Sequence, residues 1–257
     1  SPIYNNNRNL CFAIIFIMEK DLFGEELPLN SSTIRKKKRT KNDGITRTLY
    51  DYFMLDIFST LPTVGKEQMP VLEPVDANLE LTNEMVAFDE AFTKKRTNCI
   101  VHFFTDDRRF LRIFRNPKKY LPFLKECEAV IEPDLSQYIN MPYALRQAHA
   151  WLNRALAAWL QNQGVNIIQN ITWSLKDSYA YSLKGRAKNT IVAVNCTGII
   201  GHDFSKYLWR EGYKNVVLAL NPTKILRYGD RMPDEKTDIS IYFDNPNFKR
   251  QDNGSKR

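Results

Sequence analysis

One stretch decides the fold: TIVAVNCTGIIGHDFSKYLWREGYKNVVLALNPTKILRYG, residues 190–229. It opens on a short apolar run (190–195), continues through an amphipathic segment (203–220) and ends in a second apolar run (224–229). The spacing of apolar residues predicts a strand, a helix and a strand in that order. Such a unit places two parallel strands in one sheet with a right-handed helical crossover between them.

The same alternation extends outward from this stretch. Further strands are predicted at 85–88, 99–105, 129–133, 165–173 and 238–244, and further helices over 108–126 and 142–163. Runs such as VHFF (101–104) are apolar throughout, which is typical of strands covered on both faces. The sequence therefore predicts an α/β domain with a mainly parallel sheet of β/α repeats. The sheet is expected to be barrel-like or partly open, because about seven strands fall short of a regular eight-stranded barrel.

The clearest helix is the one predicted over 142–163. Pro142 suits its first turn and Gly164 its end. One apolar stripe runs along it, formed by Leu145, Ala148, Trp151, Leu152, Ala155, Leu156, Trp159 and Leu160. The stripe predicts that both tryptophans belong to the core.

The folded body is expected to span 46–248 as a single domain. A helix is predicted over 46–58, followed by a loop broken by Pro62, Pro70 and Pro74. Residues 1–45 are expected to form a flexible basic arm and residues 249–257 a basic tail. The first 17 residues are interpreted as lying upstream of a natural start at Met18, with a short edge strand at 10–17 as the alternative.

The net charge of +8 is concentrated in these two flanking segments. The run RKKKRTK contributes six cations, Arg35, Lys36, Lys37, Lys38, Arg39 and Lys41, and without it and the tail the body is close to neutral. Such a run neutralises phosphates, with an affinity that falls steeply with salt. It equally suits a solvated segment that keeps the chain soluble. Nucleic acid is therefore the expected partner of the arm.

Composition excludes several other classes of protein. Hydrophobic residues make up 43% of the chain, enough for a sizeable core. No apolar run approaches the ~20 residues of a membrane helix, so no membrane partner is expected. The cysteines at 11, 99, 127 and 196 contain no C-x-x-C pair, which argues against a zinc knuckle or a disulfide scaffold. This cysteine usage is typical of the reducing cytoplasm, the expected location. The oligomeric state stays open.

Several stretches resemble one family. HFFTDDRRFLRIFRNPKKYLPFLKECEAVIEPDLSQYINMP (102–142), GVNIIQNITWS (164–174) and EGYKNVVLALNPTKILRYG (211–229) are similar to the bacterial, archaeal and viral family called domain of unknown function 4417. The likeness covers about 86–245. It implies an origin on phages or other mobile elements and assigns no catalytic role. The chain departs from the family pattern at Arg108 and Leu111, where an aromatic and an acidic residue are expected.

Polar residues follow the predicted strands, and in parallel β/α sheets ligands bind beyond the carboxyl ends of the strands. Asp106 and Asp134 follow two such strands and are the candidate catalytic residues. If their strands are neighbours, ~4.8 Å apart, the two carboxylates can converge on a Mg²⁺ or Mn²⁺ ion. Both also suit structural roles, because Asp106 can cap the helix that follows and Asp134 can form an Asx-turn.

Further candidates for ligand binding come from the same strand-end positions. They are Asp107, Arg108, Arg112, Ser136, Trp173, Ser174, Asn195, Thr197 and Tyr228. The two arginines share a predicted helix face that could meet a phosphate, and Trp173 could stack on a base or a sugar. A solvated helix face and an aromatic lid over the sheet are the simpler interpretations.

Other motifs are weaker. NCTGIIG (195–201) is a glycine-containing turn of the kind that cradles phosphate, but it is neither a P-loop nor a dinucleotide fingerprint. Cys196 would need a histidine base, and His102 is interpreted as a core residue.

The sequence therefore leaves two functions open. The first is a phage- or mobile-element-associated, metal-dependent hydrolase that acts on phosphate or nucleic acid through Asp106 and Asp134. The alternative is a non-catalytic nucleic-acid-binding or replication-accessory module that acts through the basic arm.

Overall fold

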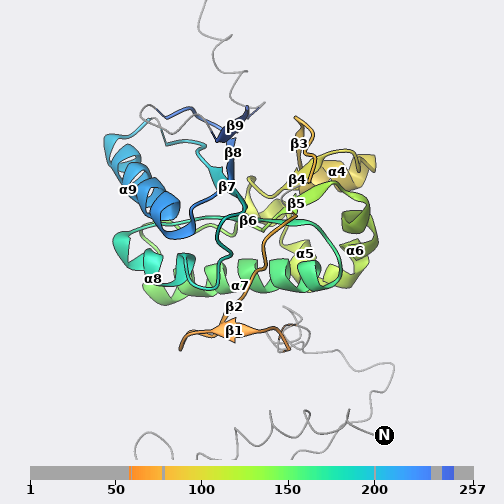
Figure 1. The fold of residues 1–257 in the computed structure, drawn as a ribbon, viewed down its shortest axis with the longest axis horizontal. Helices are drawn as coiled ribbons and strands as arrows, with labels where there is room; N and C mark the ends of the chain where they lie inside the picture. The colour runs from red at the N-terminus through yellow and green to blue at the C-terminus, as the bar shows by residue number, and fades with distance from the viewer. Residues whose placement is uncertain (1–57, 59, 77–78, 200, 233–238, 246–257) are drawn as a thin grey trace, which may run out of the picture. The chain divides into compact units, whose positions relative to one another are not determined.

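Seven parallel strands form the central sheet of the computed structural model (Figure 1). The structure describes residues 58, 60–76, 79–199, 201–232 and 239–245. The expected arm, the 10–17 run, the basic tail and nearly all of the predicted 46–58 helix lie outside these residues. The strands lie in chain order, β3 to β9, and neighbouring strands run parallel. Their bounds are Met85–Ala87 (β3), Ile100–His102 (β4), Ala129–Ile131 (β5), Ile167–Asn170 (β6), Ile191–Asn195 (β7), Lys224–Tyr228 (β8) and Ser240–Phe243 (β9).

The sheet curls into a half-barrel. Tyr228 on β8 stacks on His102 on β4 with 4.5 Å between ring centroids, and on Phe104 at 5.3 Å. β4 and β8 are four strand positions apart, about 19 Å in a flat sheet. This contact is therefore possible only on the concave side of a curled sheet. Among the described strands, β3 and β9 are the two edges, so the sheet is the partly open form of the predicted architecture.

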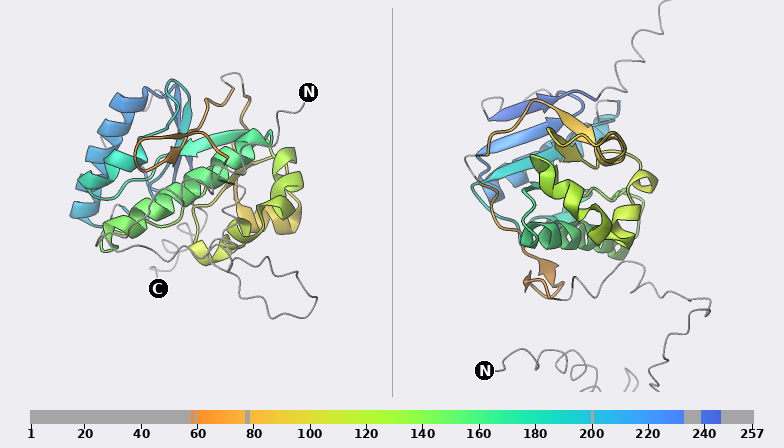
Figure 2. Two further views of the ribbon diagram at one scale, coloured as in Figure 1. Left: turned by 90° about the horizontal axis from the view of Figure 1, so that it is seen from below. Right: turned by 90° about the vertical axis from the view of Figure 1, so that its right-hand side faces the viewer.

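Helices cover the convex face, and the long α7 (Tyr143–Asn162) runs across one side of it (Figure 2). Around β4, β5 and β6 the outward side chains pack against α7 and α6 (Pro117–Glu126). Around β7 and β8 they pack against α9 (Asp203–Leu220). The shorter helices are α4 (Phe88–Lys94), α5 (Arg112–Arg115) and α8 (Tyr179–Ser182), with single 3₁₀ turns at Asp107–Arg109 and Lys176–Ser178.

Three expectations about elements need correction. The predicted helix over 108–126 is broken, because the Asn116 side chain caps α6 and Pro117 opens it. The loop expected after residue 62 contains a hairpin, β1 (Thr63–Val64) with β2 (Met69–Pro70). The helix α4, directly after β3, is absent from the prediction, because its first residue reads as the end of an apolar strand.

The stripe predicted along α7 is wrong in its first half. Leu145 and Ala148 are exposed, whereas Arg146 and Arg154 face the protein. Acidic and carbonyl partners hold these arginines: Arg146 pairs with the exposed Asp177, and Arg154 with the buried Glu132 and with two carbonyls. The second half, from Ala155 to Leu160, is buried all round, as predicted for its apolar residues.

Candidate functional site

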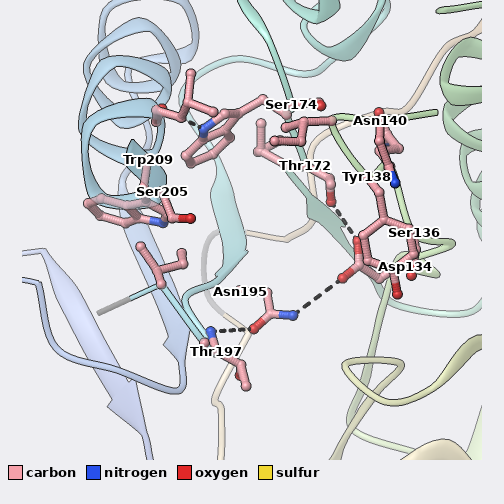
Figure 3. Close-up of a pocket in the computed structure, with 17 residues that line it drawn as sticks. Asp134, Ser136, Tyr138, Asn140, Thr172, Ser174, Asn195, Thr197, Ser205 and Trp209 are labelled. Carbon is pink, nitrogen blue, oxygen red and sulfur yellow. Dashed lines mark hydrogen bonds between the residues drawn. The ribbon is translucent and has the colours of Figure 1, made fainter. Parts of the chain in front are cut away.

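A pocket of about 730 Å³ opens at the carboxyl ends of β5, β6 and β7, beside the start of α9 (Figure 3). Parallel strands deliver their last side chains to the same edge of the sheet, so residues far apart in sequence meet there. The lining residues are Asp134, Ser136, Gln137, Tyr138, Ile139, Asn140, Ile171, Thr172, Trp173, Ser174, Asn195, Thr197, Gly198, Ile199, Ser205, Leu208 and Trp209. Six of these were candidates from sequence: Asp134, Ser136, Trp173, Ser174, Asn195 and Thr197.

The Asp134 carboxylate is the centre of the polar wall. Its Oδ1 accepts hydrogen bonds from Thr172 Oγ1 at 2.6 Å and Asn170 Nδ2 at 2.9 Å. Its Oδ2 receives one long contact, 3.5 Å from Asn195 Nδ2. Thus three neighbours fix the carboxylate while Oδ2 keeps acceptor capacity towards the pocket.

Burial raises the pKa of Asp134 above its usual range, and the negative charge of nearby Asp107 raises it further. The hydrogen bonds from Thr172, Asn170 and Asn195 act in the opposite direction and lower it. The net shift is upward, which brings the carboxyl closer to the pH at which acid–base groups work. Asp134 is therefore the best acid–base candidate in the pocket wall.

The orientation of Asn195 is set from its other side. Its Oδ1 accepts the backbone N–H of Thr197 at 2.9 Å, so its Nδ2 points to Asp134. The next amide, that of Gly198, donates to Asp230 Oδ2 at 3.1 Å. Because the N–H groups of Thr197 and Gly198 have protein partners, these two do not contribute to the phosphate cradle considered for NCTGIIG.

Aromatic side chains form the opposite wall. Trp173 follows β6 and donates its Nε1–H to Leu208 O at 3.1 Å, and its ring lies 6.1 Å from that of Trp209 on α9. Gly212 allows this approach, since a Cβ there would lie less than 3.0 Å from three atoms of the Trp173 indole. The helix α9 and the Trp173 indole therefore pack closely against each other at Gly212.

Three polar atoms around the pocket are buried without a protein partner. They are Gln137 Oε1, Ser174 Oγ and Thr197 Oγ1. An unpaired buried polar group costs about 1–3 kcal/mol, so such groups are uncommon unless a ligand or water satisfies them. Their grouping around one cavity is typical of a binding site.

Comparison with known sequences identifies the family. The family described as domain of unknown function (DUF4417) matches residues 61–246. The chain belongs to this family.

Two phage proteins are relatives of this DUF4417 member. The Gene 1 proteins of Mycobacterium phages D29 and L5 are each 27% identical to it over 179 residues, 68% of this chain. The match covers 65% of the D29 protein and 77% of the L5 protein, so the chain spans slightly less than two thirds of the former. No solved structure matches the sequence. In the part of the chain that the structure describes, no helix is long and apolar enough to cross a membrane.

The structure separates the two aspartates predicted to act together in this DUF4417 domain. Asp106 accepts the backbone N–H of Arg108 and pairs with its guanidinium at 2.9 Å. The carboxyl is exposed, and Arg108 lowers its pKa to about 2. β4 and β5 are indeed neighbours, but Asp106 caps the 3₁₀ turn after β4 and does not line the pocket.

The neighbouring Asp107, not Asp106, reaches towards the pocket. It accepts the Ser136 hydroxyl at 3.0 Å and the Ser136 N–H at 3.2 Å. The Ser136 carbonyl in turn lies 2.6 Å from His149 Nδ1. Asp107 therefore positions the loop after β5, which carries Asp134.

The remaining candidates lie elsewhere. Arg112 packs over the rings of Phe88, Phe92 and Tyr120, so it is a packing residue on the convex side. Tyr228 lies beside His102 in a second pocket of about 260 Å³ on the concave face. His102 is the buried core histidine that the sequence predicts; burial lowers its pKa to about 3.

The residues present do not fit a metal ion held by Asp106 and Asp134. Among the described residues, no three His, Cys, Asp or Glu side chains form a metal-binding group. Mg²⁺ and Mn²⁺ require oxygen ligands, whereas Asn170 and Asn195 turn amide hydrogens to Asp134. The donor set favours a protonatable carboxyl over a metal ligand.

Cys196 lies on the convex side. Its thiol is buried and accepts a hydrogen bond from Arg227 at 3.1 Å, and burial raises its pKa. It does not line the pocket.

Eleven of the seventeen lining residues, and Asn170 beside them, were missed by sequence reasoning. Asn170, Thr172, Tyr138 and Trp209 are not at the first position after a strand, where candidates were sought. Period-two alternation would have found Asn170 and Thr172, because both share the concave-side parity of Ile168.

Proposed function

We propose that this protein is a hydrolase whose active centre is the pocket at the carboxyl ends of β5, β6 and β7. The observation that carries the proposal is Asp134: a carboxyl with a raised pKa, fixed by Asn170, Thr172 and Asn195, with one oxygen available to a ligand. General acid–base catalysis requires such a positioned group. Asp106 has no part in this proposal.

The pocket suits a component of nucleic acid as substrate. A volume near 730 Å³ accommodates a nucleoside-sized ligand. Trp173 offers an aromatic surface on which a base can stack, and Ser136, Ser174 and Thr197 offer hydroxyl groups. The phage origin of the relatives agrees with such a substrate.

Exposed side chains extend this surface beyond the pocket. Tyr138 and Ile139, in the loop after β5, are 62% and 51% exposed. Phe204 and Tyr207, on the first two turns of α9, are 56% and 59% exposed. Stacking on such rings tolerates any base, so we infer that neighbouring nucleotides of a strand contact this rim.

A melting experiment tests the proposal. A ligand that binds only the folded state raises the Tm by mass action. Nucleosides, nucleotides and single-stranded DNA are expected to raise the Tm of the wild type and of Asp106→Asn, but not that of Asp134→Asn. Mg²⁺ or Mn²⁺ alone is expected to have no effect. A rise caused by metal alone and erased by Asp106→Asn would contradict the proposal.

A second function rests on the charge distribution. The six cations between Arg35 and Lys41 lie outside the described residues, and their density favours contact with phosphates. We infer that this run holds nucleic acid while the pocket acts on it. Its test is the salt dependence of binding given in the Discussion.

A further inference from the structure

We infer that the bond broken in this pocket is the N-glycosidic bond between a base and its sugar, not a phosphodiester. The inference rests on the proposed function and names the reaction of the same site. Three observations carry it: the charge of the lining, the setting of Asp134 and the unpaired polar atoms around the aromatic wall.

The lining carries no cation. None of its seventeen residues, all within the described part of the chain, is Lys, Arg or His. Phosphoryl transfer depends on metal ions or guanidinium groups that neutralise the developing charge. The candidates Arg108 and Arg112 lie outside the lining, and Arg109 pairs with Asp89 at 2.7 Å. The backbone N–H groups of Thr197 and Gly198 already have protein partners, so neither is available to a transferring phosphate.

A lone carboxylate suits the hydrolysis of a glycosidic bond better than it suits phosphoryl transfer. Breaking a bond to the anomeric carbon creates an oxocarbenium-like, positively charged transition state. The Asp134 carboxylate stabilises that charge and, with its raised pKa, accepts a proton from attacking water. The same negative charge repels a phosphate.

The other wall is able to hold a base. Trp173, Ser174 and Thr197 line the pocket, and the Ser174 and Thr197 hydroxyls, which are buried without a protein partner, can turn by side-chain rotation to the polar edge of a base or to sugar hydroxyls. Enzymes that act on a base take it out of the stack into a pocket of this kind.

The reaction balances without a further reactant. The oxygen of water bonds to C1′ as the bond from C1′ to the base nitrogen breaks, and the electron pair leaves with the base. Asp134 takes the proton released by the water and passes it to the departing base. The products are a free base bearing N–H and a sugar with an anomeric hydroxyl.

The test uses the full chain with two kinds of substrate, free nucleosides and a 5′-labelled single-stranded DNA that contains all four bases. Chromatography measures free base, and gels run before and after alkali distinguish abasic sites from direct strand cleavage. We expect free base, with strand breaks only after alkali. Which substrate reacts tells whether the base comes from a nucleoside or from a strand.

Variants tie the product to the pocket. Asp134→Asn is expected to lower base release about a hundredfold or more, and Asp106→Asn to leave it unchanged. Because Asp134→Asn changes a buried network, Ser174→Ala serves as a second variant. Its hydroxyl has no protein partner, so the fold is retained, and KM is expected to rise more than kcat falls.

The contrary outcomes are distinct. Direct strand cleavage or release of phosphate that depends on Asp134 would overturn the glycosidic inference and leave the proposed hydrolase in place. Product of neither kind, or product indifferent to both Asp134→Asn and Ser174→Ala, would overturn both.

Discussion

At the scale of single residues, Asp134 combines two features that ordinary turn aspartates lack. Its first oxygen is held by Thr172 and Asn170, and its second faces the pocket with one long contact to Asn195. Each of these donors comes from a neighbouring strand end, so the carboxyl is fixed by the sheet itself. An acid–base group held in this way needs no reorganisation when a ligand arrives.

The raised pKa of Asp134 predicts a pH-dependent stability. The folded state holds this proton more tightly than the unfolded state, so stability falls as the pH rises from the ordinary value through the raised one, and is constant above it. The Asp134→Asn variant has no titrating carboxyl at this position, so its stability does not fall in this way as the pH rises. The Tm of the variant relative to the wild type is therefore expected to increase as the pH rises above about 4, the ordinary pKa of an aspartate.

Differential scanning calorimetry at several pH values checks this prediction. The matched control is Asp106→Asn, because the pKa of the Asp106 carboxyl is lowered, whereas that of the Asp134 carboxyl is raised. The charged Asp106 carboxyl stabilises the folded wild type, and this stabilisation is lost as the pH falls towards about 2. A Tm difference for Asp134→Asn that is flat or falls with rising pH would contradict the raised pKa.

The sequence predicts six of the seventeen residues that line the carboxyl-end pocket, because position after a parallel strand is a local property. Asp134, Trp173 and Asn195 are found in this way. For Asp106 the structure shows the second of the two roles expected from the sequence, a cap, because its carboxyl accepts the Arg108 N–H at the start of the 3₁₀ turn after β4. Trp209 could not be predicted, since its place in the pocket depends on how α9 packs.

At the scale of elements, α9 and the end of β6 meet at Gly212. A glycine inside a helix normally costs up to about 1 kcal/mol relative to alanine. Here the cost is offset by close packing, because a Cβ would collide with the Trp173 indole. Gly212→Ala is therefore expected to lower the Tm, shift the tryptophan fluorescence and weaken ligand binding.

The control for this substitution is Gly201→Ala in the turn before α9, where no described atom lies within 4 Å of the added Cβ. That variant should keep the wild-type spectrum and affinity. Gly212→Ala with an unchanged spectrum and an equal or higher Tm would show that the packing of α9 on Trp173 does not shape the pocket.

The helix α7 is anchored by buried charge. Arg154 is 0% exposed, donates to Glu132 at 3.2 Å and also reaches the carbonyls of Ser182 and Lys184. Arg186 pairs with the other oxygen of Glu132. These bonds tie α7 and β5 to the segment after α8, which explains why the first half of α7 departs from an apolar stripe.

Removing Arg154 should be costly. Arg154→Leu removes the donor to the Lys184 carbonyl, one of the two donors to the Ser182 carbonyl and half of the Glu132 pairing, and a broken buried ion pair costs about 3–5 kcal/mol of unfolding free energy. Urea denaturation measures the loss. Lys94→Ala removes the exposed pair with Glu90 and should be indistinguishable from wild type. Equal, small losses for both variants would contradict an anchoring role for Arg154.

At the scale of the whole molecule, the curl of the sheet gives the domain two different faces. Strand alternation places apolar side chains on both faces, and the pocket that holds Asp134 lies at the carboxyl ends of the strands. Sequence alternation predicts the strands and their mainly parallel arrangement. It does not predict how far the sheet curls, because that depends on contacts such as Tyr228 with His102, four strands away.

The basic run should dominate the salt dependence of nucleic-acid binding. Each phosphate contact with single-stranded nucleic acid contributes about 0.7 to the slope of log affinity against log salt. Replacing the six cations from Arg35 to Lys41 by Gln is expected to lower the slope by up to about 4. Fluorescence anisotropy with labelled DNA measures it, and a slope equal to that of the wild type would contradict the role of the run.

The central claim is that chemistry occurs at Asp134 in the pocket and not at Asp106 beside β4. The most direct measurement is the initial rate of hydrolysis of one single-stranded DNA substrate by the wild type, Asp134→Asn and Asp106→Asn, side by side. A loss of about a hundredfold or more for Asp134→Asn, with Asp106→Asn within about twofold of wild type, is the predicted result. Equal rates for all three proteins, or a loss confined to Asp106→Asn, would contradict it.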